Sequence, residues 1–178
     1  PGDYSGYTVW VRGSWLVMEL VTIVAGLSAL KYVRFSFLVF PVAFSLWFMS
    51  MDTTALIFGN MDYSWDVHAW VSIAYGLAMI VGGYLIDRRT SEDFAFWIYL
   101  FGLIAFWSAA AIVTYDQELD MFFFAVVNVF LVLLSVFLQR RAFIVFGVIG
   151  LLYYMGYLAW EVFDDVLLFS FAAVGLGL

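Results

Sequence analysis

The chain has 178 residues, of which 66% are hydrophobic, 22% aromatic and 12% charged. Soluble domains are about 45–50% apolar and about 25% charged, and a soluble core of this size could not bury so much apolar surface. The composition therefore predicts a protein embedded in lipid and excludes a cytosolic enzyme. Seven Lys and Arg against 14 Asp and Glu give a net charge of −7, which excludes a nucleic-acid-binding surface. The absence of Cys excludes disulfides and Cys-ligated metal clusters.

The apolar residues form long uninterrupted stretches. A helix needs about 20 apolar residues to cross about 30 Å of hydrocarbon, and six stretches reach or approach this length: Ser14–Leu30, Phe35–Met51, His68–Ile86, Phe94–Val113, Met121–Leu138 and Phe143–Trp160. A seventh begins at Val166 and is too short to span. Barrel strands would alternate apolar and polar residues, so these solid runs favour helices. We expect an all-α, polytopic transmembrane helix bundle of about six full spans and a partial seventh.

Pro and Gly residues inside these stretches predict local geometry. Pro41 lies within the second span, where its missing N–H and its ring are expected to kink the helix. The segment Thr54–Phe58 either extends that second helix or lies in the membrane interface. Small residues let helix backbones approach closely, so we expect tight helix contacts at the glycines of the later spans: Gly76, Gly82, Gly83, Gly102, Gly147 and Gly150. At Gly82-Gly83 a bend in the helix is an equal alternative.

Basic residues occur on every second turn between the predicted spans. In the loops between those turns, all of the charged residues are acidic. Cytoplasmic loops of membrane proteins collect Lys and Arg, which places the start of this chain outside, with Arg12 as the one exception. The residues that determine this topology are Lys31, Arg34, Arg88, Arg89, Arg140 and Arg141.

The basic turns recur at a nearly constant interval. Arg34 and Arg88 are 54 positions apart, and Arg88 and Arg140 are 52 apart. This spacing predicts three parallel helical-hairpin repeats, over 14–58, 68–113 and 121–160, within a single transmembrane domain over 1–178. Any bundle with short loops and this charge pattern would also look periodic. The chain begins with Pro1 and ends inside an apolar run, so we expect it to be a fragment of a longer protein.

Glu19 is the one ionisable residue well inside a predicted span, about 7–8 Å below Ser14 by helix rise. A charge there is costly in lipid, so Glu19 should face the bundle, be protonated, or pair with Arg12 on the same helical face. It is either a proton or cation site or, as we favour, a structural polar contact. Asn128, in the middle of the fifth span, is expected to form an interhelical hydrogen bond.

His68 is the sole histidine and follows Asp62 and Asp66. Together with Asp52 or Glu161 these residues are weak candidates for a divalent metal site, but their spacing matches no recognised metal motif. We predict no metal and no cofactor. A single His also excludes bis-His haem ligation within the chain, whereas quinone or pigment binding among the aromatic residues stays open.

No catalytic motif is present: the chain contains no Gly-x-Ser-x-Gly elbow, His-Glu-x-x-His, phosphate-binding loop or dinucleotide fingerprint. We therefore expect a non-enzymatic scaffold or accessory subunit whose partners are the lipid bilayer and other membrane proteins, or further copies of itself. The alternative is a transporter or channel for a small or lipophilic solute, with Glu19 as its acid, Pro41 and Gly82-Gly83 as flexible points, and a polar cavity leading to Glu19. A weaker third hypothesis is a metal-dependent enzyme at His68.

Three segments of the second half, Arg88–Gly102, Leu138–Gly147 and Tyr157–Asp165, together with Trp47–Asp52, carry a family resemblance. The sequence resembles the C-terminal membrane region of bacterial predicted membrane proteins that carry a domain of unknown function. The resemblance implies a multi-pass protein of the bacterial cytoplasmic membrane with further spans upstream. It implies no activity and no functional residue.

Overall fold

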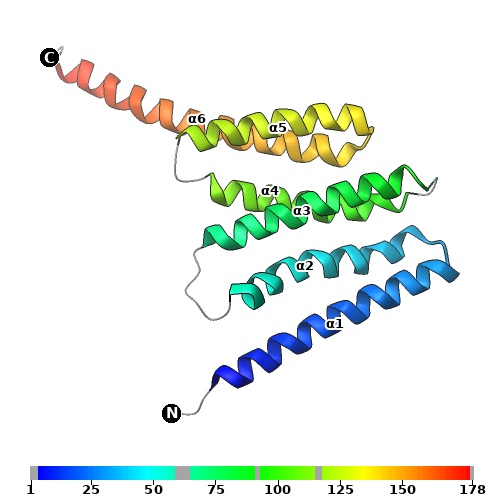
Figure 1. Ribbon diagram of the computed structural model, residues 1–178. Helices are drawn as coiled ribbons and strands as arrows, with labels where there is room; N and C mark the ends of the chain where they lie inside the picture. Colours follow the sequence, from blue (N-terminus) through cyan, green and yellow to red (C-terminus); the bar gives the residue numbers. More distant parts are fainter. Residues whose placement is uncertain (1–3, 59–64, 91–92, 115–117, 177–178) are drawn as a thin grey trace. The chain divides into compact units, whose positions relative to one another are not determined.

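The computed structural model describes residues 4–58, 65–90, 93–114 and 118–176, with side chains described over 14–52, 67–90, 93–114 and 119–160. The described residues are helical almost throughout and contain no strand, which confirms the all-α class. In chain order the elements are α1 (Tyr4–Tyr32), a 3₁₀ turn η1 (Ser36–Leu38), α2 (Val39–Phe58), α3 (Trp65–Asp87), α4 (Ala95–Val113), α5 (Glu118–Leu138) and α6 (Arg141–Leu176) (Figure 1).

Five stretches of these helices are long and apolar enough to cross a membrane: Ser14–Tyr32, Val67–Asp87, Ala95–Val113, Leu119–Leu138 and Arg141–Trp160. The second predicted span is shorter in its described apolar part, Ser36–Asp52. Large apolar side chains on these helices stay exposed, for example Val24 at 61% and Leu133 at 62%. Such surfaces are stable against lipid and not against water, so the protein is a multi-pass membrane protein.

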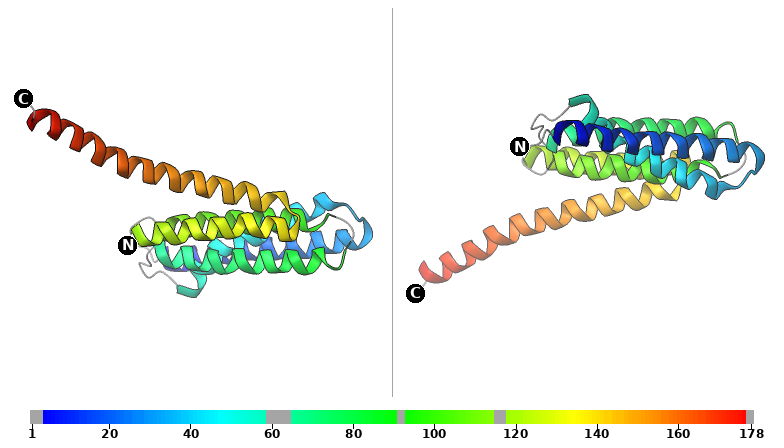
Figure 2. Two further views of the ribbon diagram at one scale, coloured as in Figure 1. Left: turned by 90° about the horizontal axis from the view of Figure 1, so that it is seen from above. Right: turned by 90° about the horizontal axis from the view of Figure 1, so that it is seen from below.

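Consecutive helices pack in pairs, α1 with α2, α3 with α4, and α5 with α6. The chain divides into two compact units, Pro1–Val113 and Thr114–Leu178. Within the first unit α2 also packs against α3 and α4, and the helices run alongside one another (Figure 2). The core of this unit includes Val39, Ala43, Met79, Ile98 and Phe101.

Glycine allows the closest approach within these pairs. A Cβ added to Gly76 of α3 would lie 2.6 Å from the backbone nitrogen of Phe106 and 2.7 Å from the carbonyl oxygen of Gly102, both on α4. Gly147 and Gly150 of α6 similarly lie against α5. The predicted contacts are confirmed at these positions and at Gly83, which lies against Tyr99. The prediction is wrong at Gly82, where nothing lies within 4 Å.

The kink predicted at Pro41 is wrong. Pro41 is the third residue of α2, because the segment before Val39 forms the separate turn η1. The first N–H groups of a helix have no acceptor within the helix, so the missing N–H of Pro41 breaks no hydrogen bond. The segment Thr54–Phe58 extends α2, which was one of the two predicted alternatives.

A turn predicted after the sixth span is also wrong. Helix α6 runs without interruption over 36 residues from Arg141 to Leu176 and is continuous in both views of Figure 2. The acidic segment Glu161–Asp165 contains neither Pro nor Gly, and without such a residue nothing in the local sequence stops a helix. The partial seventh span over 166–178 is therefore no separate helix within its described residues.

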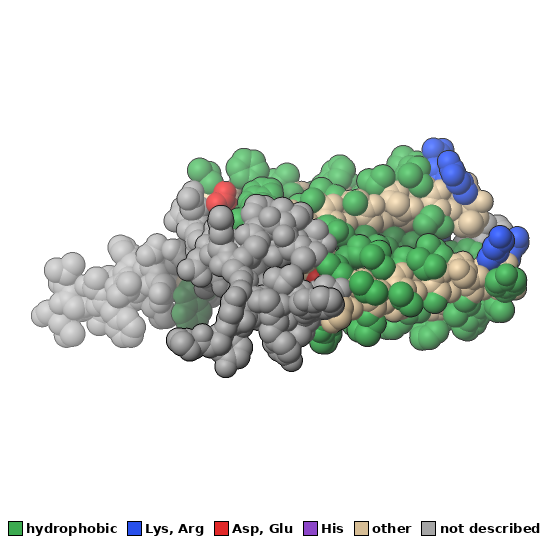
Figure 3. Space-filling view, turned by 60° about the horizontal axis from the view of Figure 1, so that its bottom comes forward, with side chains coloured by type: hydrophobic (Ala, Val, Ile, Leu, Met, Phe, Trp, Pro, Cys, Tyr) green, Lys and Arg blue, Asp and Glu red, His purple; other side chains and the backbone are tan. Residues whose placement is uncertain are grey.

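The basic turns of the first unit lie side by side. Lys31 and Arg34 stand at the turn between α1 and α2, and Arg88 and Arg89 follow α3. In the space-filling view the Lys and Arg side chains gather at one end, while hydrophobic side chains cover the flank (Figure 3). Arg140 and Arg141 connect α5 to α6 in the second unit.

Candidate ligand site at Glu19

Glu19 lies midway along α1 with its side chain against α2 and only 6% exposed. Its Oε2 atom has no hydrogen-bond partner among the residues that the structure describes. A buried carboxylate oxygen without a hydrogen-bond partner lowers the free energy of unfolding. Mutational data put this cost at about 1–3 kcal/mol. The predicted pairing with Arg12 lies outside the described side chains.

A cavity of about 350 Å³ lies beside Glu19 between the two helices of the first hairpin. Its walls come from α1 (Trp15, Met18, Thr22) and from α2 (Phe40, Pro41, Phe44, Ser45, Phe48). These positions recur every three or four residues on each helix, which places them on the facing sides. The cavity therefore combines one carboxylate with an apolar and largely aromatic wall. The expectation of a polar cavity leading to Glu19 is wrong.

The aromatic wall is a row of phenylalanines at a spacing of four along α2. The ring centroids of Phe40 and Phe44 are 6.1 Å apart, and those of Phe44 and Phe48 are 5.3 Å apart. Side chains four positions apart lie above one another on a helix, so the three rings line one side of the cavity. Aromatic faces have a negative potential that attracts cations.

The cavity opens on the lipid-facing surface of the hairpin. Three of its lining residues are substantially exposed: Trp15 at 50%, Met18 at 58% and Phe44 at 40%. Apolar solutes dissolve in the bilayer, so they can reach this opening from the hydrocarbon. A strongly hydrated ion would have to leave water first, at a high cost in free energy.

A second acidic residue makes the electrostatic potential at this site more negative. Asp52, on α2 and half-buried, interacts electrostatically with Glu19. Two like charges in a region of low dielectric constant repel each other more strongly than in water. A bound cation or proton would relieve both this repulsion and the unsatisfied oxygen of Glu19.

His68 lines a different cavity of the first unit, of about 300 Å³, together with small residues such as Ser72 and Ala109. Asp62 lies outside the described residues, as does the side chain of Asp66. Among the described side chains no group of three or more His, Cys, Asp and Glu could hold a metal ion. The predicted weak metal candidates are therefore not brought together in the part that the structure describes.

Asn128 is fully buried in α5. Its Nδ2 donates a hydrogen bond to the carbonyl oxygen of Phe124, one turn earlier on the same helix, at 2.8 Å. Its amide also lies directly against Gly150 of α6, where a Cβ would overlap it. Asn128 therefore contacts α6 closely, and this hydrogen bond is made within α5.

Comparisons with protein-family models, with curated proteins and with solved structures find no match to this chain.

Proposed function

We propose that the protein is a membrane transporter that binds a small lipophilic cation in the cavity between α1 and α2, with Glu19 as the binding acid. The observation that supports this proposal most directly is the buried Oε2 of Glu19, which lacks a partner and borders an aromatic cavity. A positive charge placed there would be attracted by the carboxylate and would lie beside the phenylalanine rings that line the cavity.

The apolar character of the lining of the Glu19 cavity favours a lipophilic cation over a hydrated metal ion. A small hydrated ion needs several oxygen ligands, whereas the described walls of this cavity present mainly aromatic and aliphatic surface beside Glu19. A cation whose charge is surrounded by hydrocarbon or aryl groups buries apolar area in the same cavity and loses little hydration. It also reaches the site from the bilayer through the exposed side between Trp15 and Phe44.

The proposal is tested with tetraphenylphosphonium as the probe and with the protein reconstituted in lipid nanodiscs. We expect saturable binding to the wild type and about tenfold weaker binding to Glu19→Gln, because the variant removes the negative charge that attracts the cation in a region of low dielectric constant. Glu19→Gln keeps the shape of the side chain, so its fold should persist. The matched control is Asp120→Asn, which removes an acid from α5 and should leave binding unchanged.

Transport is measured separately as uptake of the same cation into proteoliposomes. The wild type should accumulate it and Glu19→Gln should not. Equal affinities of wild type and Glu19→Gln would eliminate Glu19 as the binding acid. The absence of any saturable binding to the wild type would contradict a lipophilic-cation site altogether.

We also propose that the protein lies in a bacterial cytoplasmic membrane, with its basic turns facing the cytoplasm and the start of the chain outside. Two features support this: the resemblance described above, and the Lys and Arg residues at one end of the first unit (Figure 3).

A second candidate function is that of a scaffold or accessory subunit. It is favoured by the exposed apolar side chains of α6, such as Leu152 at 62%, Met155 at 64% and Trp160 at 73%, which suit contact with another membrane protein as well as with lipid. Purification in mild detergent tests this function. A partner present at fixed stoichiometry would support it, and a strictly monomeric particle would contradict it.

A further inference from the structure

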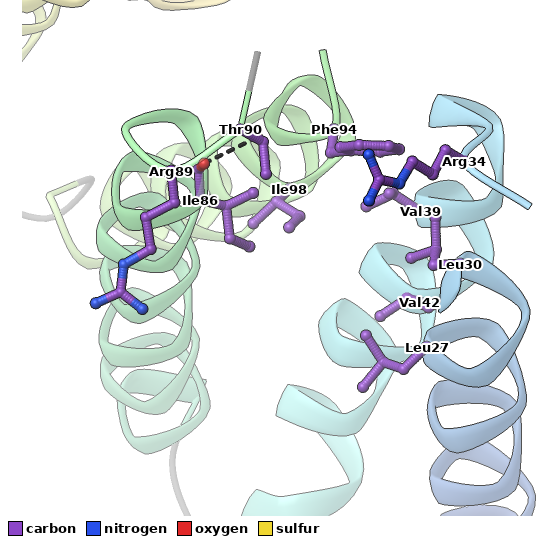
Figure 4. Close-up of a pocket in the computed structure, with 10 residues that line it drawn as sticks. All are labelled: Leu27, Leu30, Arg34, Val39, Val42, Ile86, Arg89, Thr90, Phe94 and Ile98. Atoms are coloured by element: carbon purple, nitrogen blue, oxygen red, sulfur yellow. Dashed lines mark hydrogen bonds between the residues drawn. The ribbon is translucent and has the colours of Figure 1, made fainter. Parts of the chain in front are cut away.

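A second cavity lies at the basic end of the first unit and has a volume of about 440 Å³. All four helices of the unit contribute to its apolar wall, and Figure 4 shows these side chains facing the space between the helices: Leu27, Leu30, Val39, Val42, Ile86, Phe94 and Ile98. The remaining lining residues are polar: Arg34, Arg89 and Thr90. The cavity is therefore apolar inside and basic at its mouth.

The two arginines come from different turns. Arg34 extends from the turn between α1 and α2 toward the side of the mouth where Phe94 lies, and Arg89 follows α3 on the opposite side with its guanidinium turned away from Arg34 (Figure 4). Both side chains are exposed, and neither forms an ion pair with another described residue. An exposed arginine changes rotamer at little cost, so each guanidinium group can turn toward an anion at the mouth.

We propose that this cavity is a binding site for an anionic phospholipid. Arg34 and Arg89 bind the phosphate group, since guanidinium groups match phosphate oxygens in geometry and charge. The apolar wall below them holds the first part of an acyl chain. Basic pockets between transmembrane helices are suited to anionic headgroups, and this site is separate from the Glu19 cavity.

The apolar lining of the cavity favours a lipid over a soluble phosphate compound as the occupant. A phosphate ion or a sugar phosphate would occupy the mouth and leave the apolar part unfilled. Large empty spaces are unfavourable in a packed protein, and the surrounding solvent of these helices is lipid. The hydrogen bond from Thr90 Oγ1 to the carbonyl oxygen of Ile86, 2.9 Å, also commits the hydroxyl donor nearest the arginines to the backbone (Figure 4). Among the side chains that line the cavity, the guanidinium groups of Arg34 and Arg89 are then the hydrogen-bond donors left for the anion.

The test measures lipid binding to the purified protein in detergent by native mass spectrometry, with phosphatidylglycerol and phosphatidylcholine of identical acyl chains. We expect phosphatidylglycerol to bind at least about tenfold more tightly to the wild type. The double variant Arg34→Gln/Arg89→Gln should lose about tenfold or more of that affinity and should bind phosphatidylcholine unchanged.

The matched control is Lys31→Gln/Arg88→Gln, which removes the same charge from the same two turns outside the cavity. The guanidinium of Arg88 lies 5.4 Å from the ring centroid of Tyr84, and neither control residue lines the cavity. A third variant, Leu27→Trp, fills the apolar part and keeps both arginines, so it should also weaken phosphatidylglycerol binding. Melting temperatures measured for each variant verify the fold.

Three results would overturn the proposal. An equal loss of affinity in the control double variant would show attraction by the basic end in general. Equal binding of the two lipids by the wild type would exclude recognition of an anionic headgroup. Competition by soluble glycerol phosphate at the concentration at which the lipid binds would show that the apolar wall contributes nothing.

Discussion

The side chain of Ser36 donates a hydrogen bond from Oγ to the backbone carbonyl oxygen of Asp93, at 2.6 Å. These residues are 57 positions apart in sequence, and the bond joins the turn between α1 and α2 to the turn between α3 and α4. It holds the two basic turns of the first unit together at the end where the cavity with Arg34 and Arg89 lies.

We expect Ser36→Ala to lower the free energy of unfolding by about 0.5–1 kcal/mol, because the bond is exposed and water replaces part of it. Thermal unfolding in detergent measures this change. Ser108→Ala is the control, because Ser108 also donates to a backbone carbonyl but only within α4, at 2.7 Å. If both substitutions had the same effect, the bond between the turns would have no contribution of its own.

The contact between α3 and α4 depends on Gly76. A Cβ there would meet backbone atoms of α4 at 2.6 Å and 2.7 Å, and backbone cannot move aside as a flexible side chain can. We expect Gly76→Ala to destabilise the protein by about 1–3 kcal/mol. Gly82→Ala on the same helix, where the space is open, should be neutral or slightly stabilising. Chemical unfolding of the two variants side by side decides this, and equal stabilities would contradict the contact.

Gln139 has a positive φ of 54° between α5 and α6, where the N–H of Arg140 donates to the carbonyl oxygen of Ser135 at 3.2 Å. This is the hydrogen bond of a helix end closed by a left-handed residue, a position that glycine favours. We expect Gln139→Gly to raise the free energy of unfolding by about 0.5–1 kcal/mol. Gln139→Val should lower it, since a β-branched residue is strained there. The reverse order of melting temperatures would exclude this conformation.

We expect the buried carboxylate of Glu19 to lower the stability of the protein while it provides the charge for ligand binding. Replacing the unpartnered carboxylate with an apolar side chain, Glu19→Leu, removes its desolvation cost and should stabilise the protein by about 1–3 kcal/mol. The control Met18→Leu alters the exposed neighbour on the same helix and should change stability by less than about 0.5 kcal/mol. A destabilised Glu19→Leu variant would instead indicate that Glu19 has a stabilising partner.

Much of the fold follows from hydropathy and charge alone. Long apolar runs between short polar turns predict the pairing of α1 with α2, of α3 with α4, and of α5 with α6, because short connections leave consecutive helices as neighbours. Helix ends are harder to predict. The acids of Glu161–Asp165 predict a loop by composition, yet they are also compatible with a helix, and α6 continues through them.

The site was predictable only in part. The position of Glu19 within a span marks it as unusual, and burial between α1 and α2 agrees with the expectation that it faces another helix. The phenylalanine row of α2 was missed, although its spacing of four residues was visible in the sequence. The cavity with Arg34 and Arg89 could not be predicted, because it depends on how two hairpins approach each other, and no local pattern encodes that distance.

The proposed topology has helical hairpins that cross the membrane with their basic turns on the cytoplasmic side. The chain contains no Cys, so single-cysteine variants can be labelled in sealed cells with a membrane-impermeant maleimide. Tyr32→Cys and Gln139→Cys lie beside the basic turns, and Thr114→Cys lies at the opposite end of α4; all of them keep the arginines. We predict labelling at position 114 in sealed cells, and labelling at 32 and 139 only after lysis. Modification of position 32 or 139 in sealed cells would contradict this topology.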